Sequence, residues 1–142
     1  MKTLYKTKGA LSCLLLLSII VSIVSPLALA AGPGAQSNYI GLFVGTCGFN
    51  IGSFGISNAA CTAHLKQGYS ATAKLSIMQS SDGISWSLYK DWSCSESTYI
   101  SMDQYWAVIP GYFYKAVMGL TVYDSDHNIV EYIEIDSPIQ YY

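Results

Sequence analysis

The stretch GYFYKAVMGLTVYDSDHN, residues 111–128, decides the fold of this 142-residue chain. Every second position from Tyr112 onward is apolar or aromatic, and a period of two is typical of a β-strand with one buried face. The polar run 124–128 then predicts a turn. The residues expected to point into a core are Tyr112, Tyr114, Ala116, Met118, Leu120 and Val122.

Segments before this strand alternate in the same way. Residues 59–65 and 71–78 each place apolar side chains on one face, and Asp82-Gly83 is a strong signal for a hairpin turn. The strand that returns from this turn, residues 84–92, is predicted to bury one row of large side chains, namely Ile84, Trp86, Leu88 and Trp92.

Shorter strand-like segments complete the pattern at 39–44, 100–102, 106–108 and 129–135. The glycine-rich segment 50–56 is interpreted as a bulged edge strand. No helical periodicity follows residue 30. Strands at this spacing, separated by turn residues, predict an all-β, immunoglobulin-like antiparallel sandwich of about seven strands.

The entrance to the strand at 112–122 resembles the sixth strand of immunoglobulin-like and fibronectin-type-III-like domains. In those domains a tyrosine near the start of this strand bonds back to nearby backbone, which forms the tyrosine corner. The resemblance implies that Tyr114 has this role, with Tyr112 as the alternative. Where an immunoglobulin domain has a cysteine two residues later, this chain has Ala116.

The same resemblance bears on the cysteines. Because Ala116 replaces the expected cysteine, the inter-sheet disulfide is implied to be missing, and Cys61 is expected to face Ala116 as a buried free thiol. That favours a bridge between Cys47 and Cys94. A Cys47–Cys61 bridge and a chain without any bridge remain the alternatives.

The N-terminal residues have the pattern of a secretion signal. Three lysines precede an apolar run of about fourteen residues, and Ala28-Leu29-Ala30 fits the cleavage rule. The expected organisation is a signal peptide at 1–30, a flexible leader at 31–38, the sandwich at 39–137 and a C-terminal tail at 138–142. The protein is therefore expected to be secreted, without stable membrane insertion of the mature chain.

Charge excludes two classes of function. The chain has seven lysines, no arginine and nine acidic residues, and three of the lysines lie within residues 1–30. The remaining chain therefore carries 4 − 9 = −5. Nucleic-acid binding and cationic membrane disruption both need clustered basic residues, so neither is expected.

No catalytic, metal or cofactor site is expected from the polar residues. The two histidines, His64 and His127, lack companions at zinc-ligand spacing. Asp124, Asp126 and Asn128 match the start of a calcium loop, but the sixth position lacks its glycine and the twelfth its glutamate. The run favours a polar hairpin turn, with a weak calcium site as the alternative, and the protein is expected not to be an enzyme.

The remaining signal is aromatic. Residues 31–142 hold eleven tyrosines and three tryptophans. Trp86, Tyr114 and Trp106 are predicted to be core residues. Exposed aromatic residues suit either a protein interface or a platform for sugar rings. The first interpretation is an extracellular or cell-envelope protein-interaction module that uses the turn 124–128 and an edge strand. The second is a carbohydrate-binding module in which a stacking platform is formed by Tyr89, Trp92 and Tyr99.

A closer resemblance covers most of residues 47–135. LSIMQSSDGISWSLYKDW (75–92), together with GYFYKAVMGLTVY (111–123), is similar to small secreted proteins of Gram-positive, Clostridia-like bacteria. The resemblance implies the sandwich architecture. The expected partner, an unknown extracellular protein or a cell-wall glycan, follows from the two interpretations of the aromatic residues. The resemblance implies no activity, because a fold does not define a function.

Overall fold

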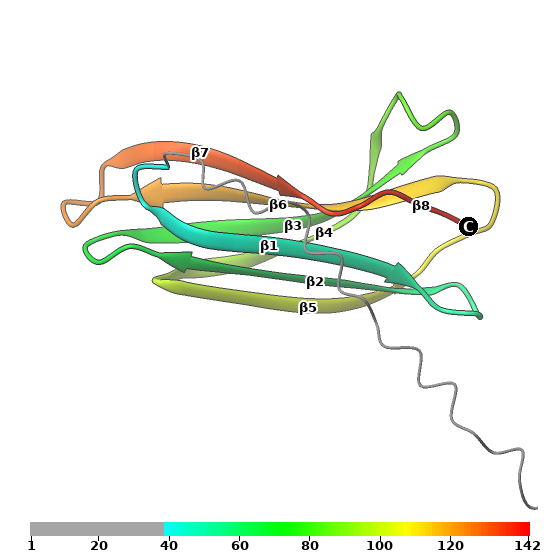
Figure 1. Cartoon of the computed structure of the whole chain (residues 1–142), viewed down its shortest axis with the longest axis horizontal. Coiled ribbons are helices and arrows are strands. Elements are labelled where there is room, and N and C mark those ends of the chain that lie inside the picture. Colours follow the sequence, from blue (N-terminus) through cyan, green and yellow to red (C-terminus); the bar gives the residue numbers. More distant parts are fainter. Residues whose placement is uncertain (1–38) are drawn as a thin grey trace, which may run out of the picture.

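The computed structural model describes residues 39–142, so the predicted signal peptide and leader lie outside the described residues. The described chain consists of strands joined by turns (Figure 1). Within this part of the chain, no helix is long and apolar enough to cross a membrane. The strands are β1 (Leu42–Ile51), β2 (Ile56–Leu65), β3 (Ser70–Ser80), β4 (Ser87–Ser97), β5 (Tyr99–Ala107), β6 (Phe113–Tyr123), β7 (Ile129–Asp136) and β8 (Gln140–Tyr141).

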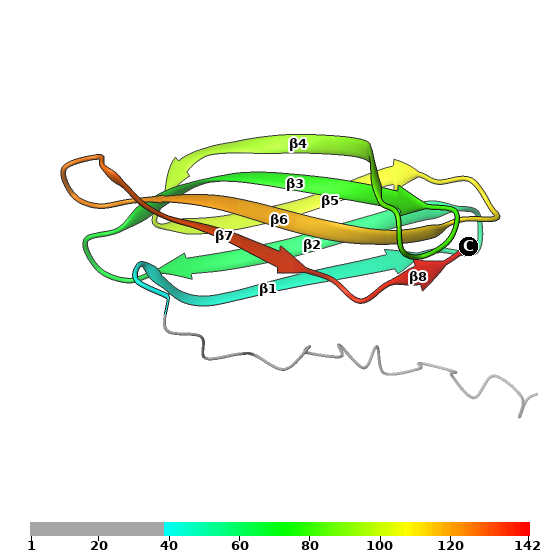
Figure 2. The same cartoon turned by 90° about the horizontal axis from the view of Figure 1, so that it is seen from above.

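The strands form two antiparallel sheets that face each other (Figures 1 and 2). One sheet has the order β1-β2-β5, and the other has the order β4-β3-β6-β7, with β8 paired to β6. The chain changes sheets between β2 and β3, between β4 and β5, and between β5 and β6. The predicted immunoglobulin-like β-sandwich is therefore confirmed.

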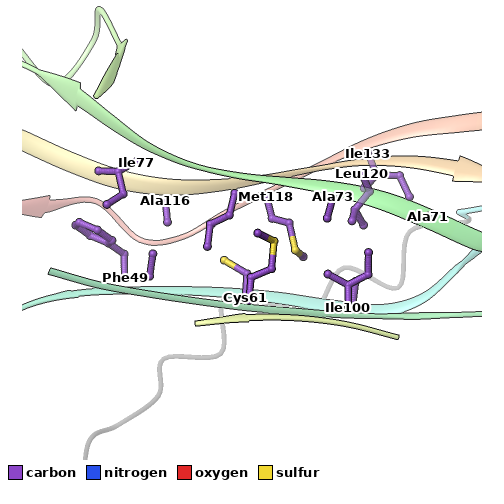
Figure 3. Packing of buried hydrophobic residues seen from close by; sticks show 14 of the residues in the cluster. Phe49, Cys61, Ala71, Ala73, Ile77, Ile100, Ala116, Met118, Leu120 and Ile133 are labelled. Carbon is purple, nitrogen blue, oxygen red and sulfur yellow. The ribbon is translucent and has the colours of Figure 1, made fainter. Parts of the chain in front are cut away.

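The strand that decides the fold is the centre of the larger sheet. β6 pairs with β3 over eleven positions and with β7 on its other side. Alternate residues of β6 are buried from Tyr114 to Val122, as the period of two predicts. Figure 3 shows Met118 and Leu120 pointing from this sheet toward Cys61 and Ile100 of the smaller sheet. Burial of these two facing rows forms the core and fixes the register of both sheets.

The predicted tyrosine corner is present at the start of β6. Tyr114 is fully buried, and its hydroxyl donates to the Ile109 carbonyl at 2.9 Å and accepts from the Ile109 N–H at 3.2 Å. The Gln79 amide donates to the same oxygen at 2.7 Å. Burial raises the pKa of the Tyr114 hydroxyl, which therefore stays protonated and able to donate. These bonds hold the β5–β6 loop against the sandwich.

The predicted inward row of residues 84–92 is wrong in part, because β4 carries a bulge. Ile77 of β3 is opposite Lys90, but Met78 is opposite Leu88, so one extra residue, Tyr89, lies between them. Such an extra residue shifts the alternation of inward and outward side chains by one position, so residues on one side of the bulge face opposite to what a strict period of two predicts. Leu88 is therefore exposed, and Tyr89 packs against the core instead.

Trp86 is consequently not a core residue. It lies before β4, on the outer face of the larger sheet, and its ring is 5.1 Å from the ammonium nitrogen of Lys115. Trp106 is also more open than predicted, because 43% of its surface is exposed at the edge of the smaller sheet. Ala116, in contrast, is completely buried, as predicted.

The favoured disulfide is also wrong. The bridge joins Cys47 and Cys61, which are directly opposite each other on the paired strands β1 and β2, with a Cα–Cα distance of 4.1 Å. Cys94 lies on β4 of the other sheet, opposite Ala73, and is the free cysteine of the described chain. Cys61 is buried in the core as predicted, but as half of a bridge rather than as a thiol.

Residues 138–142 are part of the domain rather than a tail outside it. β8 pairs with the start of β6, where Tyr141 is opposite Phe113 and the two ring centroids are 4.9 Å apart. The backbone of Tyr142 exchanges hydrogen bonds with that of Tyr112. This segment therefore closes the sheet at the end where the tyrosine corner lies.

Two carboxylates organise turns, and both make the fold sensitive to acid. Asp82 accepts hydrogen bonds from the N–H groups of Ser85 (2.7 Å) and Ile84 (2.8 Å), and these bonds lower the pKa of its carboxyl. Asp124 accepts from the Asn128 N–H, which lowers its pKa too. A carboxyl group whose pKa is lower in the folded state than in the unfolded state stabilises the folded protein. This stabilisation is complete when the pH is above the ordinary pKa of 3.8, and it is lost as the pH falls through the lowered pKa.

We therefore expect the free energy of unfolding to decrease as the pH falls below 3.8. Urea unfolding at pH 7, at pH 4 and in stronger acid measures this decrease. A variant with Asp82→Asn and Asp124→Asn should show a weaker dependence on pH in the same range. Identical pH profiles for the variant and the parent protein would contradict the assignment of the effect to these turns.

Candidate binding surfaces

The structure separates the three aromatic residues predicted to form a sugar platform. Tyr89 packs against the core, its ring edge-on to Tyr114, and its hydroxyl donates to the Ala107 carbonyl at 3.3 Å. Trp92 is half-buried between the two edge strands β4 and β5, with its ring 6.1 Å from that of Trp106. Tyr99 is 49% exposed on the outer face of the smaller sheet, beside His64. Because the three rings face different directions, they do not form one surface.

The polar groups of the turn 124–128 form hydrogen bonds with one another. The Asp124 carboxylate accepts hydrogen bonds from the N–H groups of Asp126 and Asn128, both at 2.9 Å, and from the Asn128 amide. Glu131, the next acidic residue along the chain, accepts hydrogen bonds from the N–H groups of Ile40 and Gly41 at the start of the described chain. Within residues 39–142 there is no cluster of three His, Cys, Asp or Glu side chains able to hold a metal ion.

Cys61 and His64, three residues apart on β2, do not form a catalytic couple. Cys61 is 1% exposed and bonded to Cys47, so it has no thiolate to act as a nucleophile. His64 lies on the opposite face of the same strand, with its ring 4.4 Å from the ring of Tyr99. The arrangement can stabilise the sheet but cannot activate a thiol.

One end of the sandwich carries a group of exposed apolar side chains in its turns and C-terminal residues. The turn between β1 and β2, the β5–β6 loop and the C-terminal residues meet there (Figures 1 and 2). The N–H of Val108 donates to the Gly55 carbonyl at 2.7 Å, and the N–H of Gly111 donates to the Tyr142 carbonyl. We define the apolar end by its five exposed side chains, Phe54, Ile56, Ile109, Ile139 and Tyr141.

Two properties distinguish the apolar end from the rest of the surface. The side chain of Phe54 is 92% exposed, the highest value among the large hydrophobic residues of the described chain. Three of the segments at this end, residues 52–55, 108–112 and 137–142, contain no Asp, Glu, Lys or Arg, whereas the β3–β4 turn at the same end carries Asp82. The opposite end carries the charged loops 66–69 and 124–128. The predicted contact loop is thus at the polar end of the molecule.

A shallow groove of about 270 Å³ crosses the outer face of the larger sheet. Its lining includes Trp86, the two lysines Lys74 and Lys115, and Gly119, which has no side chain. Both lysines of the groove are engaged in ion pairs, Lys74 with Asp91 at 2.7 Å and Lys115 with Asp136 at 2.5 Å. Glu134 also lines the groove and belongs to neither pair, so the surface is polar and carries an acidic group.

Sequence reasoning missed the residues of the apolar end. Phe54 lies between Gly52 and Gly55, in a segment interpreted as a bulged edge strand, and Ile109 precedes a Pro-Gly turn. A large apolar side chain within a turn is the signal that could have identified them, because turns lie on the surface. The sequence does not show that the turn with Phe54 and the loop with Ile109 lie side by side, because their meeting depends on the tertiary structure.

Comparisons with known proteins do not place this chain in a family. No family model, no curated protein and no solved structure matches this chain.

Proposed function

We propose that this chain is a secreted or cell-envelope protein-interaction module that works without catalysis and binds its partner through the apolar end. The observation that carries the proposal is the exposure of Phe54, at 92%, in an end whose segments 52–55, 108–112 and 137–142 have no charged side chain. Exposed apolar side chains that gather on one surface mark interaction sites, because leaving them in water is unfavourable.

The construction of the apolar end supports this role. Its loops are held by backbone hydrogen bonds to one another and by the tyrosine corner at Ile109. A Cβ on Gly55 would lie 2.9 Å from the Val108 carbonyl oxygen and 3.0 Å from the Tyr142 ring, so these segments are closely packed. A surface that is ordered before binding loses less conformational entropy in the complex. The predicted signal peptide and the disulfide agree with an oxidising, extracellular setting.

The test is affinity capture with the purified protein from the extracellular and cell-envelope fractions of its source, with quantitative identification of bound proteins. In the Phe54→Ser, Ile109→Ser variant we expect a specific partner to be lost, with affinity reduced roughly tenfold or more, because exposed aromatic anchors supply much of the energy of an interface. The free energy of unfolding should change by less than about 0.5 kcal/mol, because both side chains are exposed.

The matched control is Tyr132→Ser. Tyr132 is 73% exposed on β7, away from the apolar end, so this variant should retain the partner. If the Phe54→Ser, Ile109→Ser variant binds the same proteins with the same affinity as the parent, the proposed interface is wrong. The same conclusion follows if the Tyr132→Ser variant loses the partner equally.

A further inference from the structure

The outer face of the smaller sheet differs from that of the larger sheet. Its outward side chains lie in register across β1, β2 and β5, without irregularity between β2 and β5. Two central rows contain only short side chains, with Thr46, Thr62 and Ser101 in one and Gly48, Ala60 and Asp103 in the other. Short side chains across three strands make this surface flat. We call it the flat face.

Aromatic rings lie at the two ends of the flat face. Tyr99 is 49% exposed and Tyr105 is 63% exposed, and both belong to the outward row of β5. Six residues along a strand separate them by about 20 Å. The rings therefore border a platform long enough for several sugar units of an extended chain.

Charge on the flat face is almost absent. Its only acidic group is Asp103, whose carboxylate accepts a hydrogen bond from the Asn58 amide at 2.5 Å, and it has no lysine or arginine. In contrast, the outer face of the larger sheet carries the ion pairs Lys74–Asp91 and Lys115–Asp136. Exposed sheets usually carry long charged side chains that prevent non-specific association. Only the smaller sheet departs from that rule.

We infer that the flat face binds an uncharged, extended polysaccharide chain. Tyrosine rings offer an apolar face on which sugar rings stack, with a hydroxyl that remains hydrated. The Thr46 and Thr62 hydroxyls bond to each other at 2.9 Å, which leaves one of these O–H groups and the oxygen lone pairs, together with the Ser101 hydroxyl, for sugar hydroxyls. The absence of cations argues against phosphate-bearing polymers, which need lysine or arginine for charge-assisted bonds.

This site is distinct from the apolar end, and it differs from the platform predicted from the sequence in all but Tyr99. It gives the module a second ligand of another chemical class. The two surfaces meet at Ile56, which lies in the outward row of β2. Phe54 and Ile109 lie in loops beyond the strands of the flat face, so replacing them leaves the residues of the flat face unchanged.

The experiment is co-sedimentation of the purified protein with cellulose and with chitin, with polygalacturonate as the anionic comparison. We expect saturable binding to at least one of the two uncharged polymers that persists at high salt, because no ion pair contributes to it. Tyr99→Ala and Tyr105→Ala should each weaken binding roughly three- to tenfold, the range expected for loss of one stacked ring. Tyr99→Phe should retain binding, because the ring remains.

Two matched pairs of variants locate the site. Ala60→Arg places a long side chain in the centre of the flat face and should abolish binding, whereas Thr121→Arg on the outer face of the larger sheet should not. Tyr132→Ala, on that same face, should bind as the parent does. The Phe54→Ser, Ile109→Ser variant should also bind polysaccharide normally, so failure of the proposed protein interface would leave this inference standing.

Three results would overturn the inference. The first is the absence of binding to both uncharged polymers. The second is full binding by the Ala60→Arg variant, and the third is equal loss of binding in the Tyr132→Ala variant.

Discussion

Replacement of Tyr114 by alanine is expected to lower the free energy of unfolding by about 3–5 kcal/mol, the range for removal of a large aromatic side chain from a core. Tyr114 has no exposed surface, so its loss leaves a cavity between the sheets. Tyr114→Phe keeps the ring but leaves the Ile109 backbone and the Gln79 amide without their shared partner, and it should cost about 1–3 kcal/mol. Equilibrium urea unfolding, followed by tryptophan fluorescence, measures both.

Tyr112 provides the matched control. It is half-buried two positions earlier on the same approach to β6, and its hydroxyl takes no part in the corner. Tyr112→Phe should therefore change the free energy of unfolding by less than about 0.5 kcal/mol. An equal loss in the two tyrosine-to-phenylalanine variants would show that the hydroxyl bonds of Tyr114 contribute nothing specific.

The double variant Cys47→Ala, Cys61→Ala is expected to be destabilised by about 3 kcal/mol. The bridge closes a loop with a sequence separation of 14, and opening it restores conformational freedom to the unfolded chain. The loss of the buried sulfur of Cys61 adds to the effect. Reduction of the parent protein should lower its stability by a similar amount, which unfolding with and without a reductant measures.

Cys94→Ala is the control for the disulfide. Cys94 is free and half-buried on β4, so its replacement should cost less than about 1 kcal/mol. A chain processed after Ala30 should show one titratable thiol when folded and oxidised. Three titratable thiols, or equal destabilisation by Cys94→Ala and by the double variant, would contradict the Cys47–Cys61 bridge.

The wrong disulfide shows which kind of information was missing. The resemblance to immunoglobulin domains concerned a bridge between sheets, and it left Cys47 and Cys94 as the favoured pair. The bridge instead lies within one sheet, because the turn formed by residues 52–55 places Cys47 opposite Cys61. Glycines at both ends of this segment, with Gly55 at a φ of 71°, were the local signal for a turn rather than a bulged edge.

The wrong predictions of burial for two aromatic residues have a related cause. A strict period of two correctly predicted which residues of β6 are buried, because that strand pairs regularly with β3 over its whole length. The same rule failed for Trp86 and Tyr89, because a single bulge opposite Ile77 and Met78 exchanged the faces of β4. A bulge depends on how two strands meet, so alternation within one of them could not predict it.

The sequence by itself determined the all-β class, the central strand with its buried row, and the tyrosine corner. These features follow from local alternation and from one residue whose hydroxyl bonds within five positions of itself. Only the tertiary structure decided the disulfide, the apolar end and the flat face. Each of these surfaces or bonds joins segments distant in the chain, such as residues 52–55, 108–112 and 137–142. Their meeting depends on strand order and register, which are set by the packing of the whole core.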